Sequence, residues 1–307
     1  MERSFNIESN NIQSNNIRYN NSDTTISSTL NLLKMIEALF FDIDGTLVSI
    51  NTHKIPESTI SAIAEARKRG IKIFISTGRP PVLMNNIGQL QERGLIDGYV
   101  TMNGCYCFMT SREGVEDGLE GPVDVIYESA IPENDVRAMA DFCRERDLCC
   151  LFVGRDRITI LNKNQIYYDT FVKGLNAEEQ PEATWTDIPD YDVFQLTPFI
   201  DQATEDIVAE HMPGSEFNRW HPVFLDIDAK GNTKDHGIAQ IAAHFGLKPE
   251  NIMTFGDGGN DISMLEYAGT GVAMGNASDE VKSHADYITS SVDEDGIAKA
   301  LRHYGII

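Results

Sequence analysis

Two carboxylates stand directly after an apolar run near the start of the chain. The run is Ala38–Phe41, and it is followed by Asp42, Ile43, Asp44, Gly45 and Thr46. A continuous apolar run is typical of a strand buried on both faces, and parallel sheets bind ligands at the carboxyl ends of their strands. Carboxylates this close repel each other unless a cation neutralises them or one of them holds a proton. The spacing therefore indicates a cation site or a division of acid and base roles, with a plain polar turn as the alternative.

A hydroxyl, a glycine and a guanidinium follow the next apolar run. Residues 71–75 are expected to form a strand, and Ser76, Thr77, Gly78 and Arg79 come next. This combination suits an oxyanion, because the hydroxyl and guanidinium donate and the glycine allows close approach of the backbone. Taken alone, a turn beside a surface arginine is the commoner explanation of such a segment.

A glycine-rich segment with two more carboxylates occurs in the second half of the chain. It runs from Gly256 to Asp261, after an apolar run at residues 251–255. Asp257 and Asp261 offer the hard oxygen ligands that Mg²⁺ takes, and Asn260 is able to donate to a phosphate. An ordinary glycine-rich loop between a strand and a helix is the alternative.

A lysine stands at the start of a predicted helix. Lys234 begins a helical pattern that runs to Phe245. The helix dipole favours anions at this end, so a cation here suggests a functional reason. Lys230 is the competing candidate, and a solvated surface lysine is the default explanation.

Strand-like and helix-like segments alternate around these four features, which predicts a doubly wound parallel α/β sheet. The expected helices cover residues 56–69, a segment through Leu83, Ile87 and Leu90 that ends at Gly94, and residues 234–245, 262–268 and 294–304. The expected strands cover residues 38–41, 71–75, 99–101, 251–255, 271–274 and 286–289.

The middle of the chain has another texture and is expected to form an inserted α+β domain. It shows helical periods at residues 134–146 and near 207–211, and strand-like runs at 149–153, 157–161, 193–199 and 216–220. The predicted organisation is a disordered, Asn-rich tail at 1–36, a core at 37–121 and 222–307, and an insert at 122–221. Residues 114–122 are interpreted as a loop or hinge. We hypothesise that the functional chain begins near Met35.

The charge is strongly acidic. Twenty-five Lys and Arg against 47 Asp and Glu give a net charge of −22. A field of this sign disfavours nucleic acids and anionic membranes as partners, and it means that an anionic substrate needs local cations. The five cysteines lack a C-x-x-C spacing, and no apolar run is long enough to span a bilayer. Both observations favour a cytoplasmic protein with reduced thiols.

Together, the four features resemble the haloacid dehalogenase (HAD) superfamily, and within it the Cof-type phosphatases of subclass IIB. The matching residues are the DxDGT segment at 42–46, TGR at 77–79, Lys234 and GDGxND at 256–261; the turn at 102–104 is also similar. The resemblance covers residues 37–307 and is strongest to bacterial hexose-phosphate phosphatases. It implies a Rossmann-like core with an inserted cap of the C2B type.

The resemblance implies a two-step phosphoryl transfer. Asp42 would attack phosphorus and form an aspartyl-phosphate, and Asp44 would act as the general acid and then the general base. Mg²⁺ would bind the Asp42 and Asp257 carboxylates and the main-chain carbonyl of Asp44, while Asp261 would support the metal shell.

The resemblance also implies roles for the remaining candidates. The groups expected to hold the phosphoryl oxygens are Thr77, the Gly78 amide, Lys234 and Asn260, with Lys234 also pairing with Asp42. The insert would close over the site and contact the leaving group. Arg79, Asn103 and Arg219 are possible substrate contacts, as are Asn218 and Trp220. For Arg79 a structural pairing with a carboxylate is the alternative. For Asn218, Arg219 and Trp220 the commoner alternative is a place in the hinge or the core of the insert.

The predicted function is that of a Mg²⁺-dependent phosphatase acting on small phosphorylated metabolites, most of all sugar phosphates. Two alternatives remain open on the sequence alone. One is a phosphomutase of the same superfamily, which shares the DxDGT start. The other is a non-catalytic sugar-phosphate sensor. The intact set of Asp42, Asp44, Lys234 and Asp257 argues against it, because a sensor does not need a nucleophile. The preferred substrate and the oligomeric state are not readable from the sequence.

Overall fold

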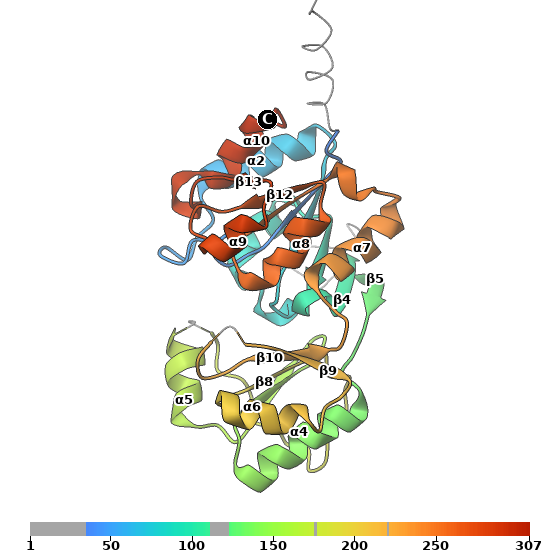
Figure 1. The fold of residues 1–307 in the computed structure, drawn as a ribbon, viewed down its shortest axis with the longest axis vertical. Helices are drawn as coiled ribbons and strands as arrows, with labels where there is room; N and C mark the ends of the chain where they lie inside the picture. The colour runs from blue at the N-terminus through green and yellow to red at the C-terminus, as the bar shows by residue number, and fades with distance from the viewer. Residues whose placement is uncertain (1–34, 111–122, 175–176, 220) are drawn as a thin grey trace, which may run out of the picture. The chain divides into compact units, whose positions relative to one another are not determined.

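The structure is a computed structural model that describes residues 35–110, 123–174, 177–219 and 221–307 (Figure 1). The predicted tail, apart from Met35 and Ile36, lies outside the described residues. So do Trp220 and the whole of the predicted hinge at 114–122.

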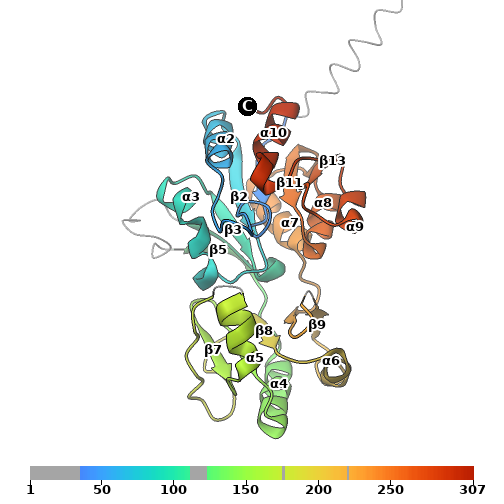
Figure 2. The ribbon, with the colours of Figure 1, turned by 90° about the vertical axis from the view of Figure 1, so that its left-hand side faces the viewer.

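A sheet of eight strands forms the larger part of the molecule, in the order β13-β12-β11-β1-β2-β3-β4-β5. Figure 2 shows it running from β5 on the left to β13 on the right. Its strands are β1 (Ala38–Phe41), β2 (Lys72–Ser76), β3 (Gly98–Thr101), β4 (Tyr106–Thr110), β5 (Val123–Glu128), β11 (Ile252–Gly256), β12 (Thr270–Ala273) and β13 (Tyr287–Ile288). Neighbours from β13 through β3 pair in parallel, and β4 and β5 add an antiparallel hairpin at one edge.

Strand β1 lies at the centre of this sheet because every one of its side chains is apolar and buried. Leu39 and Phe41 face a core shared with helices α2 (Glu57–Lys68) and α10 (Gly296–His303). Ala38 and Phe40 face the opposite core, shared with α7 (Lys234–Phe245) and α8 (Ile262–Tyr267). Alternation of side chains along a strand thus buries both faces under helices, and the predicted doubly wound fold is confirmed.

The strand order reverses at β1, which places a ligand crevice there. From β1, the chain continues to β2 and β3 on one side, whereas β11 and β12 lie on the other side. In open parallel sheets, ligands bind outside the carboxyl ends of the strands at such a reversal. Residues that directly follow β1, β2 and β11 are therefore brought together.

A second sheet of five strands forms the inserted lobe, which we define as residues 129–230. Its order is β7-β6-β8-β10-β9, and its neighbouring strands pair antiparallel. The strands are β6 (Cys150–Val153), β7 (Ile158–Leu161), β8 (Gln195–Pro198), β9 (Ser215–Asn218) and β10 (Asp226–Ala229). Helices α4 (Glu133–Arg146) and α6 (Gln202–Ala209) pack against one face of this sheet, around Met139, Leu196 and Ile227 (Figure 1).

The two sheets divide the chain at other residues than the predicted limits of the insert, 122 and 221. Strand β5 pairs with β4 in the larger sheet, so the chain leaves that sheet only after Glu128. Strand β10 pairs with β8 and β9 in the smaller sheet, so the chain returns only after Ala229. In β5 the side chains of residues 124–128 are exposed or half-buried, and β10 has four residues of which two are aspartates. Neither segment shows a clear apolar pattern, and the sequence therefore did not distinguish them from loops.

Some local elements also differ from the expectation. The helix predicted through Leu83, Ile87 and Leu90 consists of two 3₁₀ turns, η1 (Pro81–Leu83) and η2 (Asn85–Ile87), and the short α3 (Gly88–Glu92). Pro80 and Pro81 at its start and Gly88 within it disfavour one continuous helix. The short helix α5 (Gln165–Tyr167) and the π-helical turn η4 (Tyr168–Gly174) were not predicted.

The remaining short elements are 3₁₀ turns and one helix near the strand ends. They are η3 (Met102–Gly104), η5 (Pro249–Asn251), η6 (Gly259–Asp261), α9 (Asp279–Ser283) and η7 (Val292–Glu294). Within the described residues, none of the helices combines the length and apolar character that crossing a membrane requires.

Candidate active site

The predicted residues meet where the strand order reverses. Asp42 follows β1, Thr77 follows β2, and Asp257 follows β11. Asn103, in the turn after β3, joins them through its side chain: its Oδ1 accepts from Asn260 Nδ2 at 3.1 Å. Segments as far apart as residues 42 and 261 thus form one site.

A buried lysine bridges two carboxylates at the centre of the site. Lys234 Nζ donates to Asp42 Oδ1 at 2.6 Å and to Asp261 Oδ1 at 2.6 Å, and only 1% of Lys234 is exposed. Burial alone lowers the pKa of Lys234, but its attraction to Asp261 and Asp42 raises that pKa above the usual value. Lys234 is therefore a fixed cation, whereas the competing Lys230 is exposed.

Three carboxylates crowd around this lysine. One ligand oxygen each from Asp42, Asp257 and Asp261 lies within 4.8 Å of the others. Burial, followed by the charges of Asp261, Asp257 and Asp44, raises the pKa of Asp42 well above its usual value although Lys234 opposes the shift. Burial likewise raises the pKa of Asp257 to about 6. One lysine thus leaves negative charge uncompensated, and hard oxygens in this arrangement suit a divalent cation such as Mg²⁺.

The contacts of Asp261 distinguish it from the other two carboxylates. Its Oδ1 accepts from Lys234, and its Oδ2 accepts from the backbone amides of Asp257 and Gly258, each at 2.8 Å. These bonds fold the loop that carries Asp257. The geometry favours a supporting role for Asp261 rather than direct ligation.

Three neighbours fix the position of Asp257. Thr46 Oγ1 donates to its Oδ1 at 2.8 Å, and Asn276 Nδ2 donates to its Oδ2 at 3.0 Å and to the Gly45 carbonyl at 2.9 Å. Gly45 has φ +85°, and a Cβ there would lie 2.2 Å from Asp257 Oδ2, so only glycine fits. Sequence reasoning missed Asn276; its position just beyond the carboxyl end of β12 was the available indication.

Asp44 is paired with Arg79 rather than with the acidic cluster. Arg79 Nε donates to Asp44 Oδ2 at 2.6 Å, and Nη2 donates to Oδ1 at 2.9 Å. A third bond, from Nη1 to the Leu83 carbonyl at 3.0 Å, holds the guanidinium in place. Of the two roles considered for Arg79, this structure shows the pairing with a carboxylate.

Thr77 and Gly78 form a tight loop beside Asn103. The Thr77 carbonyl accepts from the backbone amide of Asn103 at 3.2 Å, and Thr77 Oγ1 accepts from the backbone amide of Arg79 at 3.1 Å. A Cβ at Gly78 would lie 3.1 Å from Asn103 Oδ1 and 3.5 Å from Asn260 Nδ2. The predicted phosphate-binding groups Gly78 and Asn260 are therefore neighbours, next to the Lys234 cluster.

A buried carboxylate of the inserted lobe reaches the same loop, and sequence reasoning missed it. Asp228 is fully buried on β10 and accepts from Gln195 Nε2 at 3.1 Å, from Asn103 Nδ2 at 2.9 Å and from Asn218 Nδ2 at 3.2 Å. Burial and the nearby Asp226 raise the pKa of Asp228 to about 7 even though these donors lower it. The short, polar β10 gave no sequence indication of this role.

The raised pKa of Asp228 predicts a specific pH dependence of stability. The folded state holds the proton up to about pH 7, whereas an unfolded aspartate releases it near its usual pKa of about 4. The stability gained from this proton is therefore lost as the pH rises from about 4 to about 7. In Asp228→Asn this component is absent, so the free energy of unfolding of the wild type relative to the variant should fall across that range and level off above it. Urea unfolding of both proteins at pH 5, 6, 7 and 8 measures the difference, and parallel curves would contradict the assignment.

Arg219 is bonded to its own segment of the inserted lobe. Its Nε donates to Glu205 Oε2 at 2.6 Å, and its Nη atoms donate to the carbonyls of Ile200, His221 and Pro222. These partners all belong to the chain between β8 and β10, so Arg219 holds that segment together. Of the two roles considered for Arg219, this structure shows the internal one.

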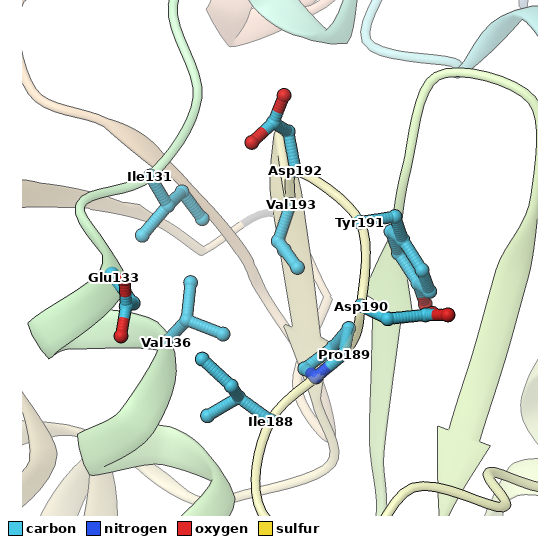
Figure 3. Close-up of a pocket in the computed structure, with 9 residues that line it drawn as sticks. All are labelled: Ile131, Glu133, Val136, Ile188, Pro189, Asp190, Tyr191, Asp192 and Val193. Atoms are coloured by element: carbon cyan, nitrogen blue, oxygen red, sulfur yellow. The ribbon is translucent and has the colours of Figure 1, made fainter.

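The inserted lobe contains a hollow of about 330 Å³ that is separate from the predicted site residues (Figure 3). It lies between the start of α4 and residues 188–193, and its lining residues include the acidic Glu133, Asp190 and Asp192. Repulsion makes such a lining unsuitable for a phosphate, and none of the predicted site residues lines it. The candidate active site is therefore the residue cluster at the ends of β1, β2 and β11.

Comparison with known proteins agrees with this arrangement. Residues 39–301 match the family described as haloacid dehalogenase-like hydrolase. The chain belongs to this family. The family resemblance expected from the motifs is confirmed, and the matched range includes every predicted site residue.

Individual members of the HAD family show the same similarity along nearly the whole chain. The Bacillus subtilis protein named "Putative phosphatase YkrA" is 33% identical over 88% of this chain and 98% of its own length. A second protein of that organism, 5-amino-6-(5-phospho-D-ribitylamino)uracil phosphatase YcsE, is 28% identical over 88% of this chain and 96% of its own. Among solved structures, the HAD subclass IIB sugar phosphatase BT4131 has a TM-score of 0.78 at 49% identity, covering 88% of this chain and 100% of that one.

Proposed function

We propose that this HAD-family chain is a Mg²⁺-dependent phosphatase that hydrolyses small phosphorylated metabolites, above all sugar phosphates, through an aspartyl-phosphate on Asp42. The observation that carries the proposal is the buried Lys234 between Asp42 and Asp261. It supplies the local cation that an anionic substrate needs on a protein of net charge −22.

The first chemical step forms a bond between Asp42 and phosphorus. A carboxylate oxygen of Asp42 attacks the phosphoryl group while the bond from phosphorus to the sugar oxygen breaks. Asp44 gives its proton to that leaving oxygen. Thr77, the Gly78 amide, Lys234 and Asn260 hold the phosphoryl oxygens during this transfer.

The second step releases phosphate from Asp42. Asp44 takes a proton from a water molecule as the water oxygen attacks phosphorus, and the bond from phosphorus to Asp42 breaks. To act in either step, Asp44 must leave Arg79. Their side chains are 47% and 31% exposed, and ion pairs this exposed are worth only about 0–1 kcal/mol. The pairing is therefore easily broken.

Mg²⁺ would be held by the carboxylates of Asp42 and Asp257 and the main-chain carbonyl of Asp44, with Asp261 supporting the loop. When bound, it would supply positive charge that reduces the repulsion between the Asp42 carboxylate and a phosphate dianion.

The inserted lobe would act as the cap that excludes bulk water and contacts the leaving group. Its Asp228 and Gln195 already reach the larger lobe at Asn103 and Gly78. The 49% identity to a subclass IIB sugar phosphatase supports sugar phosphates as the substrate class. The five cysteines, all free, support a reducing, cytoplasmic location.

Phosphate release from a panel of esters tests the proposal. With Mg²⁺ we expect turnover of hexose and pentose phosphates to exceed that of nucleotides and pyrophosphate, and EDTA should abolish it for every ester. A wild-type protein that converts one sugar phosphate into its isomer, dependent on traces of a bisphosphate, would favour the phosphomutase. A folded protein that binds sugar phosphates without turnover would favour the sensor.

A further inference from the structure

The contacts of Asp228 connect the inserted lobe to the groups that hold phosphate. Gln195 and Asp228 are opposite each other on β8 and β10, and their neighbours Leu196 and Ile227 face the helices of the lobe. Alternation along the strands therefore turns Gln195 and Asp228 toward the other face of the smaller sheet. On that face they bond to the larger lobe.

The charge of Asp228 determines which way the amide of Asn103 points. An ionised carboxylate only accepts hydrogen bonds, so Asn103 must turn its NH₂ group toward Asp228. The carbonyl oxygen of Asn103 then faces Asn260, which must turn its own NH₂ group toward the site to donate at 3.1 Å. The orientation of Asn260 thus follows from a carboxylate on the other lobe.

A second branch leads from Asp228 to the loop after β2. Gln195 Nε2 donates both to Asp228 Oδ1 at 3.1 Å and to the Gly78 carbonyl at 3.3 Å. The turn after β3, which carries Asn103, has a strained backbone. Met102 and Asn103 have φ of +48° and +52°, although neither is glycine. Such a conformation persists only where the surroundings hold it, and the bond to Asp228 is part of what holds Asn103.

We propose that Asp228 is a positioning residue that acts through Asn103 and Gln195 to orient Asn260 and the Gly78 loop for binding the phosphoryl group. The phosphate site is then complete only while the inserted lobe is docked on the larger one. This inference rests on the proposed function, since that function assigns the phosphoryl oxygens to Asn260 and Gly78.

Asp228→Asn is the first variant that tests the inference. Three amide donors converge on Asp228, and an asparagine there presents one donor to them, so Asn103 or Gln195 must turn away. The affinity for inorganic phosphate is measured by calorimetry with Mg²⁺ at pH 8, where Asp228 is ionised. We expect the Kd to rise about tenfold, the effect of losing one hydrogen bond to a charged group. Because inorganic phosphate has no leaving group, a role of Asp228 in contacting the sugar would leave this Kd unchanged and would overturn the inference.

Exchanging the two side chains provides the rescue. Asn103→Asp alone places two carboxylates together and should also weaken phosphate binding. In the double variant, which combines Asn103→Asp with Asp228→Asn, the amide introduced at position 228 donates to the carboxylate introduced at position 103. That carboxylate also accepts from Asn260, and the new amide oxygen at position 228 accepts from Gln195. Asn218 donates to the same oxygen of Asp228 as Asn103 does, so it must turn its own amide oxygen toward position 228. Each contact then again joins a donor to an acceptor. We expect the Kd of the double variant to return to within about threefold of the wild-type value. A double variant that folds but binds no better than either single variant would overturn the inference.

Asp135→Asn is the matched control. Asp135 is also a buried carboxylate of the inserted lobe, but it accepts from the Gly214 amide and Ser215 Oγ of the same lobe. The substitution Asp135→Asn should lower the melting temperature without changing the Kd for inorganic phosphate. An equal rise in Kd would show that any weakening of the lobe has this effect, against the inference. Turnover of sugar phosphates by the wild type is measured in parallel. A wild type that binds phosphate but does not turn over sugar phosphates would contradict the proposed function alone. Equal phosphate affinities of the wild type and all variants would contradict the inference alone.

Discussion

Asp42→Asn is expected to lower kcat for phosphate release by more than about 10³-fold, because an amide cannot form the acyl-phosphate that the reaction requires. The variant should still fold. Asn retains an oxygen to accept from Lys234, and it removes one of three carboxylates that lie within 4.8 Å of one another. Steady-state release of phosphate from a hexose phosphate with Mg²⁺ measures the loss, and thermal unfolding establishes that the fold is intact.

Two comparisons make the Asp42 result specific. Asp135→Asn changes a buried carboxylate that has no contact with the reacting groups, and it should keep kcat within about threefold of wild type. Retention of even a tenth of the wild-type turnover by a folded Asp42→Asn protein would remove Asp42 as the nucleophile.

Lys234→Met is expected to have the largest effect on stability. The side chain of Lys234 is 0% exposed, and its removal leaves Asp42, Asp257 and Asp261 without their internal cation. Removing one partner of a buried ion pair costs about 3–5 kcal/mol, so we expect a loss of this size in the free energy of unfolding in EDTA. Turnover should be lost as well, since Lys234 balances the charge of both Asp42 and the phosphate.

Mg²⁺ provides a second readout for Lys234→Met. A divalent cation should stabilise the variant more than the wild type, because in the variant no lysine helps the cation to neutralise the three carboxylates. Urea unfolding with Mg²⁺ and with EDTA measures both effects. Lys230→Met is the control: Lys230 is exposed, and its loss should change the free energy of unfolding by no more than about 0.5 kcal/mol. Equal responses of wild type and Lys234→Met to Mg²⁺ would show that the lysine and the cation do not share these carboxylates.

The sequence predicts the larger sheet and its site well, because one physical rule places both. Each buried strand is a short apolar run, and Asp42, Thr77 and Asp257 stand immediately after such runs. Residues at the carboxyl ends of neighbouring parallel strands must meet, so sequence order alone brings them together. Lys234 was identified by its odd position at a helix start, and burial then distinguishes it from Lys230.

The inserted lobe was predicted less well, because its contacts depend on pairings that no local pattern contains. Asn103 and Asp228 are 125 residues apart, and nothing in the short segment around Asp228 indicates a partner. The edge strand β5 and the short β10 lack a clear apolar pattern, which is why the predicted limits at 122 and 221 differ from the places where the chain passes between the two sheets. Arg219 shows the same limit: its residue type permits both a ligand contact and an internal ion pair, and its pairing with Glu205 appears only in the structure.

The neck of the inserted lobe consists of two chain segments that are fastened together. Asn232 Nδ2 donates to Ser129 Oγ at 3.1 Å, and Asn232 Oδ1 accepts from Tyr127 Oη at 3.0 Å. The lobe therefore begins and ends at one place on the larger sheet. A module attached in this way can be exchanged between homologous scaffolds by joining the chain at two adjacent points, without threading backbone through the catalytic half. The second joining point, at Asn232, lies two residues before Lys234. A shift of the backbone at this junction would therefore displace Lys234, so this junction must be joined without any change in register.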